Sequence, residues 1–380
     1  MNKTIKYFDS PSKESLEKYL EEFRDENPDG SIFAMVAETD KDYVTEIQSV
    51  AKKFSVPLVG AIFPALIYDF EFKKSGVLFF GLPYSPDYCM KEVEPGGIEQ
   101  VENLANSISK DLSHSLENKE EDKSLLIVFD AMIPNIATIL DELYVQFGDS
   151  VQYMGINAGS ESFQPMDCIF NEDAIISNGM LIIMMQPHKG AVLEHGYKVP
   201  EKTISATSTT GNKISTIDWK PAFEVYSEKI KEQFDVDITA ENFYQYSVHF
   251  PFGITRADGE ILVRIPVILN EDKSLLCVGE IPENSILTLL DAPKPESLHT
   301  VENLAKKTEE NSTNLLFYCA GRKMHLKEGA EKELKDLKSL KKGSDYHGAL
   351  TLGEIGSSHK GGYPLFHNAT LVVIGSISKN

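Results

Sequence analysis

The chain has 380 residues, of which 58 are acidic and 37 are basic, so its formal net charge is −21 at pH 7. This balance argues against a protein that tracks nucleic-acid phosphates or binds an anionic membrane surface, because both functions need positive patches. The length allows one large domain or two ordinary domains, each with a sizeable core.

The N-terminal part of the chain alternates between predicted helices and strands. Ser10 and Pro11 are typical of the cap and first turn of a helix, and apolar residues then recur at helical spacing as far as the Asn-Pro-Asp-Gly stop at 27–30. The next predicted elements are a strand at 32–36, a helix at 43–54, and strands at 57–62 and 76–81. The same order recurs as a helix at 98–116, a strand at 125–129, a helix at 136–147, and strands at 152–156 and 179–185.

A third round of this order occupies the end of the chain. Its elements are a helix at 297–308, a strand at 315–319, a helix at 327–340, and strands at 348–352 and 369–374. The leading helices of the second and third rounds share the sequence Val-Glu-Asn-Leu-Ala, at 101–105 and 301–305. We interpret the pattern as three diverged α-β-α-β-β units, in which each strand–helix–strand step gives parallel neighbours and the return strand is antiparallel.

The predicted fold class is therefore α/β (α+β), with mixed sheets covered by helices and with two packed halves. Residues 190–296 do not fit the repeat, and we expect them to lie outside it. They contain a β-rich segment at 191–217, a helix at 222–233, and short strands at 261–267 and 274–278.

The cysteines and the N-terminal sequence indicate in which cellular compartment we expect the protein. Cysteine occurs at four widely separated positions, without a CxxC or CxxCH motif: Cys89, Cys168, Cys277 and Cys319. This spacing argues against a metal ribbon, a disulfide framework and covalently attached c-type haem. The N-terminus contains no apolar signal core, and the longest apolar run, residues 180–185, is too short to span a bilayer. We expect a soluble, cytoplasmic protein without membrane insertion.

Polar residues gather at the ends of the last strands, where loops commonly carry sites. Cys319 is either a redox-active or nucleophilic thiol with His367 as its base, or a small buried hydrophobic residue. Arg322 and Glu354 either form a salt bridge or bind the two ends of a zwitterionic ligand. His367 and Asn368 either position a ligand or cap strands through backbone hydrogen bonds. His367 is also a candidate ligand of haem iron.

Two further histidines are candidates for the same chemistry. His249 lies among aromatic residues, a setting that suits haem and a packed core equally well, and His195 precedes a glycine in a similarly ambiguous setting. The sequence contains no nucleophile elbow, no HExxH motif, no P-loop and no kinase motif. We therefore predict that the protein is not an enzyme.

Several short sequences together resemble one protein family. The C-terminal half of the FIST family, a family of intracellular signal-transduction sensory domains, is similar to CAGR at 319–322, GALTLGEIG at 348–356 and FHNATLVV at 366–373. Its other motifs are similar to GAVLEHG at 190–196, WKPAFEVY at 219–226, PFG at 251–253 and LVR at 262–264. The sequence WKPAFEVY at 219–226 resembles the junction of the family's two halves. We therefore place the domain boundary near residue 218, which gives domains 1–218 and 219–380.

The resemblance implies a cytoplasmic sensor of a small ligand, such as an amino acid, that acts on a separately encoded effector. The ligand-binding candidates are Cys319, Arg322, Glu354, His367, Asn368 and Arg264. A subset of the family binds haem, senses nitric oxide and regulates a histidine kinase or a cyclic-di-GMP enzyme. For that alternative the candidate axial ligands are His195, His249 and His367. The alternative from another class is a cysteine-dependent enzyme that uses Cys319 and His367.

Overall fold

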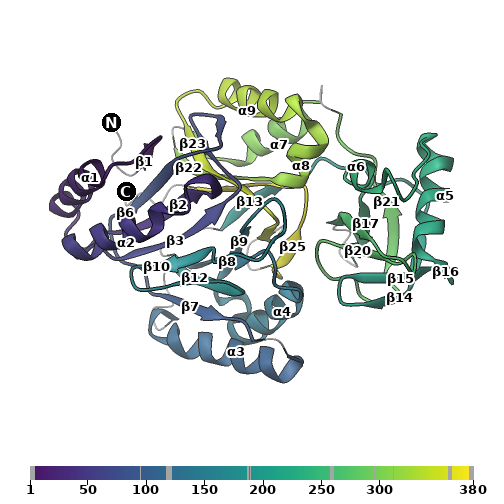
Figure 1. Cartoon of the computed structure of the whole chain (residues 1–380), viewed down its shortest axis with the longest axis horizontal. Coiled ribbons are helices and arrows are strands. Elements are labelled where there is room, and N and C mark those ends of the chain that lie inside the picture. Colours follow the sequence, from purple (N-terminus) through teal and green to yellow (C-terminus); the bar gives the residue numbers. More distant parts are fainter. Residues whose placement is uncertain are drawn as a thin grey trace.

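A computed structural model shows three similar units that form a core, with a further β-rich domain on one side of it (Figure 1). The structure describes residues 5–94, 96–116, 122–185, 188, 190–256, 261–294, 297–310, 312–357 and 362–375. Within these ranges, no helix has both the length and the apolar character needed to cross a bilayer.

The first two units have the same element order. The first comprises β1 (Ile5–Phe8), α1 (Lys13–Glu26), β2 (Ser31–Ala37), η1 (Glu38–Asp40), α2 (Tyr43–Phe54), β3 (Leu58–Phe63), the hairpin β4 (Ala65–Tyr68) and β5 (Glu71–Lys73), and β6 (Val77–Leu82). The second comprises β7 (Tyr88–Glu92), α3 (Ile98–Asp111), η2 (Ser113–Leu116), β8 (Ser124–Asp130), α4 (Ile136–Phe147), η3 (Gly148–Ser150), β9 (Gln152–Ala158), the hairpin β10 (Ile169–Asn171) and β11 (Ile175–Ile176), and β12 (Gly179–Met185).

The third unit repeats this order around an interruption. It comprises β13 (Ala191–Glu194), α7 (His299–Lys307), β22 (Thr313–Cys319), α8 (Ala320–Leu326), α9 (Glu328–Leu340), β23 (Asp345–Thr351), the hairpin β24 (Glu354–Gly356) and β25 (Leu365–His367), and β26 (Leu371–Ile374). The chain between β13 and α7 builds the additional domain. The prediction that residues 190–296 lie outside the repeat is therefore wrong for β13, which is the leading strand of the third unit.

The cap of α1 shows how local sequence sets one helix boundary. Ser12, rather than the predicted Ser10, is the N-cap: its hydroxyl accepts the N–H of Ser15, and the Ser15 hydroxyl accepts the N–H of Ser12. This reciprocal capping box satisfies two backbone donors at the start of the helix. The apolar side of the helix then buries Leu16, Leu20 and Phe23.

The strand order confirms the predicted repeat. The three units form the strand orders β1-β6-β2-β3, β7-β12-β8-β9 and β13-β26-β22-β23. The strand pairs β2–β3, β8–β9 and β22–β23 are parallel, and β6, β12 and β26 pair antiparallel with the first strand of each pair. Each unit also has a leading edge strand and a hairpin, which the predicted α-β-α-β-β pattern lacks.

The hairpin of each unit completes the sheet of a different unit. In the first sheet β3 pairs with β10 of the second unit, in the second sheet β9 pairs with β24 of the third unit, and in the third sheet β23 pairs with β4 of the first unit. No unit completes its six-stranded sheet alone, and because the exchange is cyclic, the three hairpins together link all three units. In Figure 1 the helices of the three units accordingly lie on three different sides of the core.

A glycine at one repeated position allows the parallel strands to approach. The positions are Gly60 in β3, Gly155 in β9 and Gly348 in β23. A Cβ atom there would lie 2.3, 2.3 and 2.1 Å from a backbone carbonyl oxygen of the neighbouring strand, on Ala34, Ile127 and Leu316 respectively. No side chain fits in that space, which explains why glycine recurs in the three middle strands.

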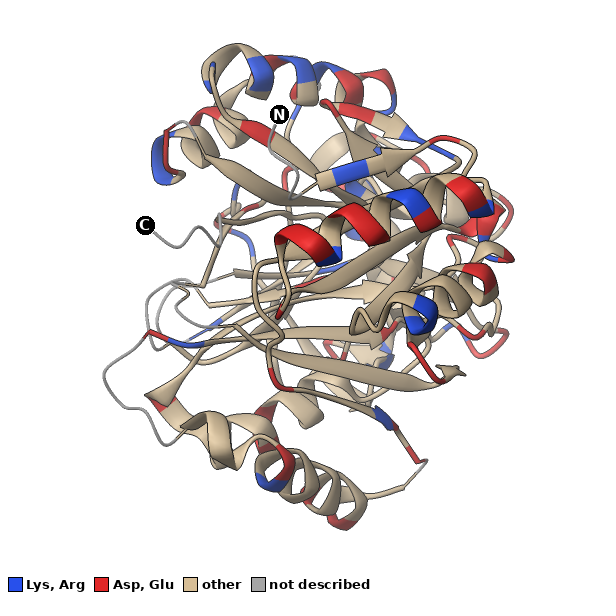
Figure 2. Ribbon diagram, turned by 90° about the vertical axis from the view of Figure 1, so that its left-hand side faces the viewer, with Lys and Arg blue, Asp and Glu red and all other residues tan. Residues whose placement is uncertain are grey.

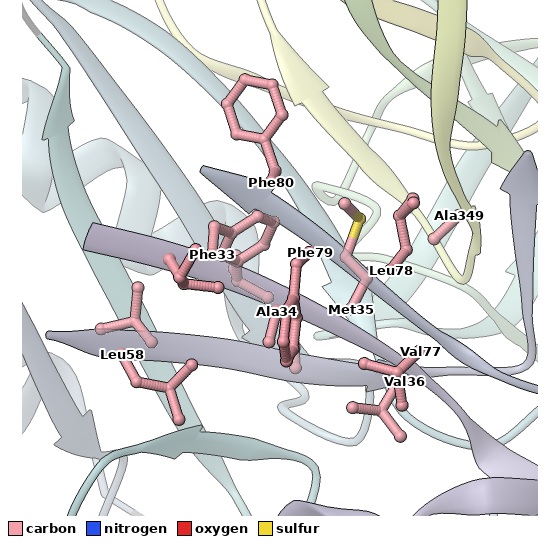
Figure 3. Close-up of a cluster of buried hydrophobic side chains, with 14 of the residues drawn as sticks. Phe33, Ala34, Met35, Val36, Leu58, Val77, Leu78, Phe79, Phe80 and Ala349 are labelled. Atoms are coloured by element: carbon pink, nitrogen blue, oxygen red, sulfur yellow. The ribbon is translucent and has the colours of Figure 1, made fainter. Parts of the chain in front are cut away.

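The three sheets share a buried apolar core. One cluster of buried side chains contains residues from all three units, including Phe33, Ile156 and Phe317. Figure 3 shows part of it, where Met35 of β2 and Leu78 of β6 lie beside Ala349 of β23. Charged residues lie mainly on the outer helices and loops (Figure 2). The same arrangement explains why every residue of β2 is buried.

The inserted domain, residues 198–291, interrupts the third unit. It contains β14 (Ile204–Thr210), β15 (Lys213–Ile217), β16 (Lys220–Pro221), α5 (Ala222–Phe234), α6 (Phe243–Ser247), β17 (Phe252–Thr255), β18 (Ile261–Arg264), β19 (Pro266–Leu269), β20 (Leu275–Cys277) and β21 (Ile286–Leu289). These strands form one sheet in the order β18-β17-β21-β14-β15-β20-β19, with β16 paired to β15. The domain has its own apolar core, which includes Tyr226, Phe243 and Phe252.

The two ends of the inserted domain are adjacent. Lys198 and Asp291 exchange two backbone hydrogen bonds of 3.0 and 3.1 Å. The boundary predicted near residue 218 falls between β15 and β16 of the domain's sheet. That boundary stays a prediction about independent folding.

Candidate ligand-binding site

A cavity of about 50 Å³ lies where the inserted domain meets the carboxyl ends of β22 and β23. Its volume corresponds to roughly three to five water molecules. The inserted domain contributes Ser247, Val248, Ile265 and Val267, and the core contributes Phe163, Cys319, Met324, Leu352 and Asn368. Ligands of open α/β sheets commonly bind at the carboxyl ends of strands, so both its location and its mostly apolar lining suit a small molecule.

Cys319 ends β22 and lines the cavity. Its sulfur accepts the N–H of Ala369 at 3.1 Å, and its thiol is hydrogen-bonded to the Glu354 carboxyl group. Asp130 ends the equivalent strand β8 and accepts the N–H of Asn178 at 2.6 Å in the same way. Burial, assisted by the nearby Glu354 carboxyl group, raises the pKa of the Cys319 thiol well above its ordinary value. The thiol is therefore neutral at physiological pH.

Glu354 lies in strand β24, and it is 0% exposed. The Thr351 hydroxyl donates to its Oε1 at 2.6 Å, and the Thr370 N–H donates to its Oε2 at 3.4 Å. Burial raises the pKa of Glu354 to about 8. Cys319 in the cavity wall and Glu354 behind it thus form an uncharged, hydrogen-bonded pair.

Arg322 does not pair with Glu354, contrary to one of the two predictions for these residues. Its side chain is fully buried and forms a bidentate ion pair with Glu333 of α9, with N–O distances of 2.6 and 2.9 Å. Its remaining donors bind the carbonyl oxygens of His195 and Ala369 and the hydroxyl of Thr300. Because these bonds occupy the guanidinium group, Arg322 has no donor left for the carboxylate of a ligand.

His367 and Asn368 have different environments although they are adjacent. His367 pairs with Glu354 across β24 and β25, and burial, followed by the nearby His195 and Arg264, lowers its pKa to about 3. Asn368 lines the cavity and is 1% exposed. Among the residues that the structure describes, neither its side-chain oxygen nor its side-chain nitrogen has a hydrogen-bond partner. An unpaired buried amide is destabilising by about 1–3 kcal/mol, so it indicates a missing partner.

Arg264 lies in a separate cleft of about 440 Å³ that the inserted domain forms with α4 and the segment around β25. Its guanidinium donates to the carbonyl oxygens of Glu280, Val263 and Phe366 at 2.8–3.0 Å, and it lies 5.5 Å from the Phe366 ring centre. Burial lowers the pKa of Arg264 to about 10. The structure therefore brings Cys319, Glu354 and Asn368 together and places Arg264 elsewhere.

The three candidate axial ligands do not fit a haem group. None of them lines the cavity, and its volume is far too small for a tetrapyrrole. His195 Nδ1 accepts the N–H of Tyr197 at 3.0 Å, and His249 Nδ1 is 2.7 Å from His325 Nδ1. The described part of the chain also contains no group of three or more His, Cys, Asp or Glu side chains suited to a metal ion.

The His249–His325 bond joins the inserted domain to α8 next to the cavity. His325 Nε2 donates to the Pro293 carbonyl oxygen at 3.0 Å, so its Nδ1 accepts the hydrogen bond from His249 Nδ1. Burial lowers the pKa of both imidazoles, that of His249 to about 4, so both are neutral at pH 7. Each histidine follows a residue that lines the cavity, Val248 and Met324 respectively.

Sequence reasoning missed the contribution of the inserted domain to this site. Ser247, Val248, Ile265 and Val267 belong to no motif, although the aromatic setting of His249 and the motif that contains Arg264 lie near them in the sequence. It also missed Glu333 as the partner of Arg322, because a glutamate on an amphipathic helix has no local feature that indicates burial. These contacts depend on how the inserted domain and the helices pack against the core.

Comparisons with known proteins agree with this organisation. The FIST N domain matches residues 31–220, and the FIST C domain matches residues 222–357. An uncharacterized protein of Methanocaldococcus jannaschii is 26% identical over 141 residues, which cover 34% of this chain and 27% of that protein. The chain thus spans little more than a quarter of the length of this relative. The two domain matches cover most of the chain and confirm the predicted resemblance: the protein belongs to the FIST family, whose domains are sensory domains of signal transduction.

Proposed function

We propose that this protein is a cytoplasmic sensor in which a small molecule binds the cavity between the inserted domain and the third unit. The observation that carries the proposal is a mostly apolar cavity lined by both parts of the molecule, with the amide of Asn368, which has no partner among the described residues, in its wall. Family membership supports a role in signal transduction. The effector is a separately encoded signalling protein, such as a histidine kinase or a cyclic-di-GMP enzyme.

Ligand binding affects the junction of the two parts because both contribute to the cavity wall. Ser247 and Val248 come from the inserted domain, whereas Ala320 and Met324 belong to α8. A ligand that contacts both sides stabilises one relative position of the two parts over others. The His249–His325 hydrogen bond beside the cavity links the same two parts, so occupancy of the cavity is coupled to the position of α8.

The cysteine-dependent enzyme is the weaker proposal. A nucleophilic cysteine needs a lowered pKa or a competent base, whereas burial raises the pKa of Cys319 and lowers the pKa of His367 to about 3. Both changes oppose a thiolate–imidazolium pair. We propose that the protein binds its ligand without transforming it.

Haem sensing is also a weaker proposal, because none of the three candidate histidines lines the cavity. Absorption spectroscopy of protein mixed with haem is the direct check. We expect no saturable Soret change that depends on His195, His249 or His367. A stoichiometric Soret band lost in one of the corresponding alanine variants would restore this alternative.

The sensory proposal is tested with pools of small metabolites and a variant that fills the cavity. Val267 lines the cavity, whereas its neighbour Ile268 on β19 is 48% exposed and does not line it. One pool contains amino acids and another contains neutral amides. We expect at least one pool to raise the melting temperature of the wild type and of Ile268→Phe. Val267→Phe should not respond. An equal response of all three proteins, or no response of the wild type, would contradict the proposal.

A further inference from the structure

We propose that the cavity ligand is a small neutral molecule with a hydrogen-bond donor and acceptor side by side, as in a primary amide or a lactam, on an apolar body. This inference rests on the proposed sensory function of the same cavity and specifies its ligand class. It follows from the chemistry of Asn368, the absence of an available cation in the described lining, and the mostly apolar character of the other lining residues.

The first step is the amide of Asn368. An asparagine side chain carries an acceptor oxygen and a donor nitrogen in one plane, and here both atoms are buried without a partner among the described residues. A single charged or hydroxyl group satisfies only one of them well. A cis amide edge satisfies both at once, because its N–H faces the asparagine oxygen and its carbonyl oxygen faces the asparagine nitrogen.

The second step is charge. A bound carboxylate needs a cationic partner, but the donors of Arg322 are bound to Glu333, Thr300 and two backbone carbonyl groups. Arg264 lines the other cleft. The single charged residue in the described lining is Glu161, whose side chain is exposed. A zwitterion would therefore leave its carboxylate unpaired in an apolar cavity, which is strongly unfavourable.

The third step is the remaining wall. Phe163, Val248, Ile265, Met324 and Leu352 present hydrocarbon or thioether surface. The neighbouring Cys319 and Glu354 are kept uncharged by burial. An apolar ring or short chain packs against such surfaces, whereas a strongly hydrated group does not. The wall therefore selects an uncharged ligand with one polar edge.

Four compounds with five-membered rings of similar size differ in charge and in their hydrogen-bond donors and acceptors. 2-Pyrrolidinone has the donor–acceptor edge, cyclopentanone has an acceptor alone, pyrrolidine is a cation at neutral pH, and proline is a zwitterion. Met324 lines the cavity, so the ¹³C-methyl signal of labelled Met324, assigned with Met324→Leu, reports occupancy of the full-length protein. We expect 2-pyrrolidinone to shift this signal saturably and to bind at least tenfold more tightly than the other three compounds.

Two variants of Asn368 test whether its side-chain amide causes the preference for 2-pyrrolidinone. Asn368→Leu should abolish the preference for 2-pyrrolidinone over cyclopentanone. Asn368→Thr replaces the paired donor and acceptor by a single hydroxyl group, and it should weaken 2-pyrrolidinone binding about tenfold even if the leucine variant folds poorly. An unchanged preference in a folded variant would overturn the role of this amide.

The outcomes distinguish the ligand class from the sensory function. If proline or pyrrolidine binds as tightly as 2-pyrrolidinone, the neutral-ligand inference is wrong but the cavity remains a ligand site. If none of the four shifts Met324 while a metabolite pool still stabilises the wild type and not Val267→Phe, the inference is again wrong and the sensory proposal stands. If the pools also have no effect, both proposals fall.

Discussion

Five hydrogen bonds hold the guanidinium group of Arg322, which lies between α8 and α9. Two of them form the ion pair with Glu333, whose side chain is also almost completely buried. The same glutamate accepts a hydrogen bond of 2.6 Å from the Tyr318 hydroxyl. Arg322 thus joins two helices, the strand end at Tyr318 and the segment after β13 through one buried charge network.

The first prediction concerns this ion pair. Arg322→Met leaves the Glu333 carboxylate buried without its cation, so we expect the free energy of unfolding in urea to fall by roughly 3–5 kcal/mol. The double variant Arg322→Met/Glu333→Leu removes both charges and should recover much of that loss. A stable Arg322→Met protein that has lost ligand binding would instead show that Arg322 recognises the ligand.

At the scale of elements, the exchanged hairpins and the inserted domain have opposite consequences for folding. Each hairpin supplies a strand that another unit needs, so the three units are interdependent. The inserted domain, in contrast, forms its own sheet and leaves the core at two adjacent residues, Lys198 and Asp291. We infer that the core folds as one body and that the inserted domain is the separable part.

The second prediction tests this division. Replacing residues 199–290 by a two-residue Gly-Gly turn should leave a core that unfolds cooperatively on heating, because Lys198 and Asp291 are already hydrogen-bonded neighbours. The matched fragment 219–380, which begins at the predicted boundary, should aggregate. It lacks β13, β14 and β15, and it leaves β23 without its partner β4. Cooperative unfolding of fragment 219–380, with aggregation of the shortened core, would favour the boundary near residue 218.

At the scale of the whole molecule, buried neutral histidines make the fold sensitive to acid. Burial lowers the pKa of His195 and His249 to about 4 and that of His367 to about 3, from an ordinary value of 6.5. Between these values the unfolded chain binds protons that the folded chain does not. Their contribution to stability is therefore complete above pH 6.5 and is lost as the pH falls through about 4.

The third prediction follows from this difference. We expect the urea midpoint of the wild type to fall more steeply between pH 6.5 and pH 4.5 than that of His367→Leu, whereas the exposed-site control His299→Leu should follow the wild type. Glu354 acts in the opposite direction: burial raises its pKa to about 8, so its contribution is present below pH 4.5 and is lost as the pH rises through 8. The histidine effect is therefore measured as the difference between proteins at each pH. Parallel curves for wild type and His367→Leu would contradict it.

Local patterns in the sequence determined most of the helices and strands. The predicted helices at 43–54 and 136–147 and the strand at 179–185 coincide with α2, α4 and β12. The repeat was also predictable, because apolar periodicity acts over a few residues. The position of the return strand was not, because its pairing with the first strand of each unit is a contact between distant segments. Short strands such as β10 and β24 were not, because a few residues of strand have no distinctive period until a partner strand binds them.

Only the tertiary structure decided which side chains and strands contact one another. The sequence by itself identified Cys319, Glu354 and Asn368 as residues at strand ends, but their association depends on β24 leaving its own unit to pair with β9. It also identified Arg322, whose pairing with Glu333 depends on the packing of α8 against α9. The cavity exists only because the inserted domain packs against α8. Strand and helix propensities are local, whereas exchange, ion pairing and cavity formation are set by contacts between segments far apart in the chain.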